Sequence, residues 1–119
     1  MPAIRAVFVT VSPLLADIIQ RALRGRVEIR TVARITTRHR ITMRLRRWRP
    51  DVVLIRLRRG EDDSIARSIV EALPQATVIA ISPGIRHAYI HEMRPHRTVL
   101  ANFSRGDLIE QILRRINRP

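Results

Sequence analysis

Residues 49–57 read Arg49-Pro50-Asp51-Val52-Val53-Leu54-Ile55-Arg56-Leu57. Pro50 cannot continue a helix, so it indicates that a helix ends before it. The apolar run after it is typical of a strand covered on both faces, as in a parallel sheet. Arg56 holds the last inward position of this strand. A guanidinium is a permanent cation without a free lone pair, so it can neither accept a phosphoryl group nor coordinate a metal ion at this point.

Strand and helix patterns alternate on both sides of this segment, separated by short turn signals. We expect strands at residues 4–11, 27–33, 52–57, 77–81 and 98–101, and helices at residues 13–24, 36–48, 61–73, 84–93 and 104–116. This alternation implies right-handed crossovers and a sheet with helices on both faces. The prediction is an α/β, flavodoxin-like (βα)5 three-layer sandwich with a five-stranded parallel sheet in the order 2-1-3-4-5. It forms a single domain over residues 1–119, with a functional crevice at the carboxyl ends of the strands.

Two of the expected helices begin with capping signals. Ser12 precedes Pro13 at the start of the first helix, and a serine at this position accepts a hydrogen bond from the first turn. Ser104 and Asp107 have the spacing of a capping box at the start of the last helix. These residues therefore fix the two helix starts.

Composition indicates a basic globular domain. The chain has 119 residues and a net charge of +13, and all 23 of its basic residues are arginine. A GC-rich genome accounts for the missing lysine, but not for so large an excess of positive charge, which suits a polyanion, an acidic partner or an anionic membrane surface. The absence of cysteine excludes disulfides and thiolate metal sites. With no signal peptide and no membrane-spanning run, a cytoplasmic protein without membrane attachment is expected.

Four segments resemble the receiver domains of bacterial two-component response regulators. They are residues 4–15, where a strand runs into a Ser-Pro-Leu helix start, and residues 49–55, 74–82 and 99–112. Their order and spacing together carry the resemblance, which covers essentially the whole chain. It implies a domain of signal transduction or transcription control.

The same resemblance places the family's phosphorylation pocket on Thr10, Val11, Arg56, Ser82, Thr98 and Ala101. Thr10 and Val11 stand where the family has its magnesium-binding acidic pair, and Arg56 stands where it has its phosphoacceptor Asp. Thr98 replaces the switch aromatic, Ala101 replaces the lysine, and only Ser82 keeps the family's residue type. The proline after the lysine is Asn102. The resemblance thus implies a degenerate pseudo-receiver that is not an enzyme and uses neither magnesium nor another cofactor.

Arginines are concentrated in and around the second expected helix. They are Arg38, Arg40, Arg44, Arg46, Arg47 and Arg49. Such a stripe suits the phosphates of a nucleic acid or an acidic protein partner. An ordinary solvated helix face explains it equally well. No helix-turn-helix, zinc-finger or aromatic RNA-binding motif accompanies it, which argues against sequence-specific reading.

Two further hypotheses concern Arg56 and the partner surface. Arg56 either reaches out to solvent, or pairs with Glu61 or Asp62 and locks one conformation, or binds an anion as a ligand sensor. In the receiver family the fourth helix, fifth strand and fifth helix form the partner surface, and here it would hold Ile85, Tyr89, Arg94, Asp107, Glu110, Arg114 and Arg115. That surface favours a protein partner or a homodimer. His87 and His91, spaced i and i+4, are interpreted as part of a polar helix face rather than a metal site.

Overall fold

The computed structural model describes the backbone of residues 3–25, 28–93 and 97–116, with the side chains of residues 97, 98 and 116 left aside. Within these ranges the strands are β1 (Ile4–Val9), β2 (Ile29–Ile35), β3 (Val52–Arg56), β4 (Thr77–Ile81), β5 (His87–His91) and β6 (Arg97–Ala101). The helices are α1 (Pro13–Leu23), α2 (Ile41–Trp48), α3 (Ser64–Ala72) and α4 (Arg105–Ile116). None of the helices in the described part of the chain is long and apolar enough to cross a bilayer.

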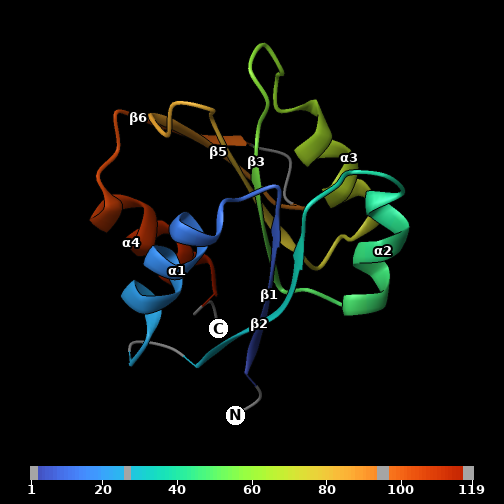
Figure 1. The fold of residues 1–119 in the computed structure, drawn as a ribbon, viewed down its shortest axis with the longest axis horizontal. Helices are drawn as coiled ribbons and strands as arrows, with labels where there is room; N and C mark the ends of the chain where they lie inside the picture. Colours follow the sequence, from blue (N-terminus) through green and yellow to red (C-terminus); the bar gives the residue numbers. More distant parts are fainter. Residues whose placement is uncertain (1–2, 26–27, 94–96, 117–119) are drawn as a thin grey trace.

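The strands form one sheet in the order β2-β1-β3-β4-β5-β6. The first four pair in parallel, whereas β5 is antiparallel to both of its neighbours. The α/β class and the order 2-1-3-4 are therefore confirmed, but the prediction of five strands, all parallel, is wrong. The additional strand is β5, which lies between β4 and β6, the strand that was expected beside β4 (Figure 1).

The inserted strand β5 occupies the segment where a helix over residues 84–93 was expected. Ala88 and Ile90 are fully buried on one side of this strand, and His87, Tyr89 and His91 alternate with them. This two-residue period belongs to a strand that is buried in the sheet. The Ser82 hydroxyl accepts hydrogen bonds from the backbone N–H groups of Arg86 (3.1 Å) and His87 (3.0 Å), which closes the turn into β5.

Two helices cover each face of the sheet, as Figure 1 shows. On the α1 and α4 side, Phe8, Leu54 and Ile79 point into one apolar cluster. On the α2 and α3 side, Val9, Ile55 and Ala80 point into another. Consecutive residues of a strand thus point into the apolar clusters on opposite faces of the sheet. This arrangement is the three-layer sandwich that was predicted.

The starts of α1 and α4 follow local capping signals, whereas α2 and α3 begin later than predicted, α3 at Ser64 instead of residue 61. The Ser12 hydroxyl accepts the Leu15 N–H at 3.2 Å, and Ser104 and Asp107 exchange hydrogen bonds as a capping box. By contrast, α2 begins at Ile41 instead of residue 36, directly after Arg40 at φ 51°. Residues 36–40 therefore form a loop between β2 and α2, at the carboxyl ends of the strands.

Candidate functional site

The candidate site lies at the carboxyl ends of β1 and β3 and is named here the carboxyl-end site. It consists of Thr10, Arg38, Arg56 and Glu61. Thr10 has φ 53°, an unusual conformation for a β-branched residue. Its N–H donates to Ile35 C=O at 2.7 Å, and its hydroxyl lies 3.0 Å from Arg56 C=O. These bonds fasten the end of β1 to both neighbouring strands.

Arg56 extends from the end of β3 toward the turn between β4 and β5. Its side chain is half-buried, and its Nη2 donates a hydrogen bond to Pro83 C=O. The expected pairing of Arg56 with Glu61 or Asp62 is wrong, because neither carboxylate accepts from it. The guanidinium instead joins the end of β3 to the turn before β5 through a backbone acceptor.

The partner of Glu61 is Arg38, which comes from the loop before α2. Only 9% of the Arg38 side chain is exposed, and its Nη1 donates to the Glu61 carboxylate. Its Nη2 donates to Arg56 C=O at 2.7 Å. The expectation that Arg38 flanks an exposed arginine stripe is therefore wrong. The sequence pattern placed residue 38 on a helix, whereas the chain there is a loop folded over the end of β3.

The carboxylate of Glu61 is fixed by two donors. Besides Arg38, the Arg58 N–H donates to it at 2.8 Å. The Arg38 hydrogen bond, followed by the contribution of Arg58, lowers the pKa of Glu61 below its ordinary value against an opposing effect of burial. Glu61 is thus held as an anion at neutral pH.

The other acidic residues near this edge are also engaged. Asp62 accepts the Ser64 N–H at 2.9 Å, and this bonding to Ser64 lowers the pKa of Asp62. Asp63 lies 2.7 Å from His91 Nε2, and both residues are buried. No group of three or more His, Asp or Glu side chains able to hold a metal occurs in the described part of the chain. A magnesium ion fits poorly here, because two guanidinium groups lie where hard anionic ligands would be required.

Among the remaining predicted pocket residues, Thr98 and Ala101 lie away from Arg56, Val11 faces a core cluster, and Ser82 is near but engaged in a turn. Strand β5 lies between β4 and β6, so Ala101 and the backbone of Thr98 are about 10 Å from β4 across the sheet. Val11 packs against the core beneath α1 and α4. Ser82 is near, but its hydroxyl closes the turn into β5.

Asn102 explains one departure from the receiver pattern. Its φ is 52°, in the left-handed region. A proline is locked near −65° and cannot occupy this position, whereas asparagine tolerates it. The backbone after β6 therefore differs from a chain that carries proline there.

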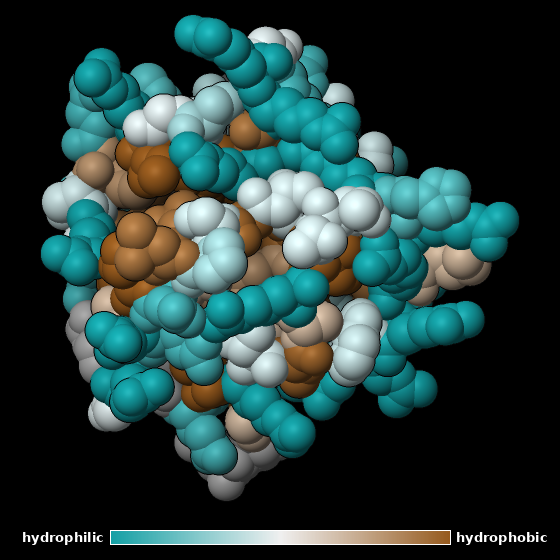
Figure 2. Space-filling model, in the orientation of Figure 1, coloured by the Kyte–Doolittle hydropathy of each residue, from teal (hydrophilic) through white to brown (hydrophobic). Residues whose placement is uncertain are grey.

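Four arginines of the predicted stripe form an exposed patch, named here the α2 basic surface: Arg40, Arg46, Arg47 and Arg49. Arg44 is half-buried, and its guanidinium bonds to Thr37 and His39. Exposed Met43 and Trp48 lie on the same helix. Figure 2 shows hydrophilic side chains extending over the region of α2, at the right of the view.

The expected partner surface is divided by the sheet. Tyr89 packs against the core on the α2 and α3 side, whereas Asp107, Glu110, Arg114 and Arg115 belong to α4 on the opposite side. Ile85 is in the turn before β5, and Arg94 lies outside the described residues. Arg115 bonds to Glu92 at 2.9 Å. These residues do not form one continuous face.

The element order, the parallel β2-β1-β3-β4 core and the paired helix layers define a receiver-like α/β fold. A solved structure with this fold is the signal receiver domain of the response regulator NarL from Mycobacterium tuberculosis. It aligns with 99% of this chain and all of its own chain, with a TM-score of 0.62 and 19% sequence identity. No protein-family model and no curated protein matches the sequence.

Proposed function

We propose that the chain is a phosphorylation-independent pseudo-receiver, a regulatory domain of bacterial signal transduction or transcription control that acts by association with a protein partner. The receiver-like fold supports the class of protein. The observation that carries the loss of phosphorylation is Arg56 at the end of β3, where a receiver has its phosphoacceptor carboxylate. Thr10 and Val11 supply no carboxylate in its place.

The contacts around Arg56 support a fixed conformation rather than a switch. Arg38 Nη1 and Nη2 donate to Glu61 and to Arg56 C=O, and Arg56 Nη2 donates to Pro83 C=O, so these donor groups are already engaged within the protein. The anion-sensor alternative has less support, because both guanidinium groups already have internal acceptors. Regulation would then come from the concentration of the partner, not from a phosphodonor.

The test is incubation with acetyl phosphate and Mg²⁺, followed by intact-mass measurement. We expect no mass increase of one phosphoryl group, under conditions in which a receiver with its phosphoacceptor Asp is modified. Light scattering with and without the phosphodonor should give the same oligomeric state. A stoichiometric phosphoryl adduct on a carboxylate would refute the proposal.

A nucleic-acid-binding module is the second candidate, supported by the exposed side chains of the α2 basic surface. Counterion release makes such binding strongly salt-dependent. Titration of labelled DNA and RNA at two salt concentrations should show saturable binding that is lost in Arg40→Ala/Arg47→Ala if this candidate is correct. The absence of binding at low salt would eliminate it.

A further inference from the structure

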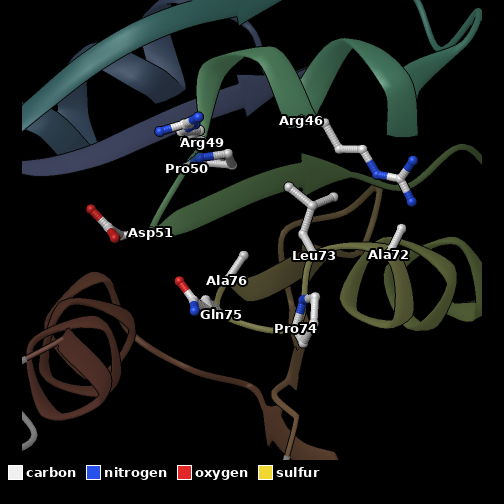
Figure 3. Close-up of a pocket in the computed structure, with 9 residues that line it drawn as sticks. All are labelled: Arg46, Arg49, Pro50, Asp51, Ala72, Leu73, Pro74, Gln75 and Ala76. Carbon is white, nitrogen blue, oxygen red and sulfur yellow. The ribbon is translucent and has the colours of Figure 1, made fainter.

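A groove lies at the opposite end of the sheet from the carboxyl-end site, and it is named here the amino-end groove. It is a cavity of about 420 Å³ where the C-termini of α2 and α3 meet. Arg46 and Arg49 border it, and its apolar lining includes Pro50, Ala72, Leu73 and Pro74. Figure 3 shows Leu73 directed toward α2 and the Arg46 side chain extending toward the end of α3.

The two arginines of the amino-end groove are unpaired within the described residues. Within the described residues, neither the Arg46 nor the Arg49 guanidinium makes a hydrogen bond or an ion pair. Arg34, Arg38 and Arg115, by contrast, pair with Asp17, Glu61 and Glu92. The positive charge at the groove is therefore available to an external anion.

Asp51 is the acidic residue among those that line the groove, and its carboxylate is bonded to a backbone N–H. Asp51 Oδ2 accepts the Arg5 N–H at 2.8 Å, and Figure 3 shows its carboxylate directed away from the groove. Arg5 Nε donates to Trp48 C=O at 2.9 Å, so a third arginine meets the partially negative C-terminus of α2. In the part of the chain that the structure describes, neither Arg46 nor Arg49 is therefore paired with the Asp51 carboxylate.

We propose that the amino-end groove binds a short acidic peptide segment of a protein partner, with one aliphatic side chain against Pro50 and Leu73 and flanking carboxylates on Arg46 and Arg49. This inference rests on the proposed function as an association domain and names the chemistry of the partner. Charge complementarity selects an anionic occupant. The apolar lining selects a peptide over a nucleic acid, because a sugar-phosphate backbone has no aliphatic side chain like that of leucine to bury there.

The test is isothermal titration calorimetry with a capped peptide in which glutamates flank a central leucine. The emission of Trp48, the single tryptophan and the neighbour of Arg49, provides a local readout. We expect saturable binding by the wild-type protein. Arg46→Gln/Arg49→Asn should weaken it at least about tenfold, since two charge-assisted contacts are lost. Asparagine is chosen because residue 49 has φ 47°.

The matched control is Arg59→Gln, which removes an exposed charge in the loop after β3, at the opposite end of the sheet. This variant should retain wild-type affinity. A peptide with serine in place of leucine should bind about tenfold more weakly, because the apolar contact is lost. Circular dichroism verifies that each variant is folded, and Arg46→Lys/Arg49→Lys should recover part of the affinity.

Three results would overturn the inference. The first is the absence of saturable peptide binding. The second is a loss of peptide affinity in Arg59→Gln equal to that in Arg46→Gln/Arg49→Asn. The third is tighter binding of a single-stranded oligonucleotide than of the peptide, through Arg46 and Arg49. None of them depends on phosphorylation. If the protein is not phosphorylated by acetyl phosphate and does not bind the peptide, only the peptide-binding inference is refuted. If the protein is phosphorylated and binds the peptide, only the pseudo-receiver proposal is refuted.

Discussion

Arg38 Nη2 donates a hydrogen bond to the backbone carbonyl of Arg56 at 2.7 Å, so the loop before α2 is attached to the end of β3. The same guanidinium pairs with Glu61 from the loop before α3. Arg56 in turn reaches Pro83 in the turn before β5. Three loops at the carboxyl ends of the strands are thus joined by two arginines, with no metal or phosphoryl group required to hold them.

Removing one member of the Arg38–Glu61 pair should destabilise the fold. The side chains are 9% and 26% exposed, so Glu61→Gln leaves a largely buried cation with a weaker acceptor. We expect a loss of about 1–3 kcal/mol in the free energy of unfolding, measured by urea denaturation. Glu71→Gln, which neutralises an exposed residue of α3, is the matched control and should change stability by less than about 0.5 kcal/mol. A double-mutant cycle with Arg38→Met that shows simple additivity would contradict the interaction.

Acid should weaken the fold through Glu61. Its pKa is lower in the folded protein than its ordinary value near 4.5, with the Arg38 hydrogen bond as the main cause. The ionised form therefore contributes stability above the unfolded pKa, and that stability is lost as the pH falls through the folded pKa. Unfolding measured from pH 7 downward should show a decline below about pH 5. The decline should be shallower in Glu61→Gln, and an identical profile in both proteins would contradict the assignment.

Most of the fold is predictable because the signals are local and strong. The uninterrupted apolar run of residues 52–55 identifies a covered strand, and Ser104 with Asp107 identifies a helix start. Strand β5 was missed because five residues, His87–His91, are too few to separate a two-residue period from a helical one. Arg38 was misplaced for a different reason. Its burial depends on the tertiary contact with Glu61, 23 residues away, which no local pattern encodes.

Restoring a carboxylate at position 56 should not restore phosphorylation. In Arg56→Asp, Thr10 and Val11 still provide no acidic partners for magnesium, and the Arg38 guanidinium remains over the strand end. Without a metal ion, the charge on the transferred phosphoryl group is not neutralised in the usual way. Intact mass after treatment with acetyl phosphate and Mg²⁺ should be unchanged. A stoichiometric adduct in this single variant would show that Arg56 alone blocks the reaction.

We expect the Ser82 side chain to stabilise the turn between β4 and β5. Its hydroxyl accepts from the N–H groups of Arg86 and His87, and Ser82→Ala would remove both bonds. We expect a loss of about 1–2 kcal/mol in stability and faster amide exchange at the start of β5. Ser68→Ala is a suitable control, because the Ser68 hydroxyl only donates to Ser64 C=O within α3. Equal effects of the two substitutions would contradict a special role for Ser82.

Breaking the buried contact between Asp63 and His91 should destabilise the fold. Asp63 precedes α3, and His91 ends β5, so their 2.7 Å contact joins the inserted strand to the helix layer. His91→Phe leaves the carboxylate without the imidazole and should cost about 2–4 kcal/mol. Asp63→Leu/His91→Phe replaces both polar groups with apolar ones and should cost less than the sum of the single substitutions. Chemical denaturation of the four proteins measures this coupling, and additive losses would show that the two side chains act independently.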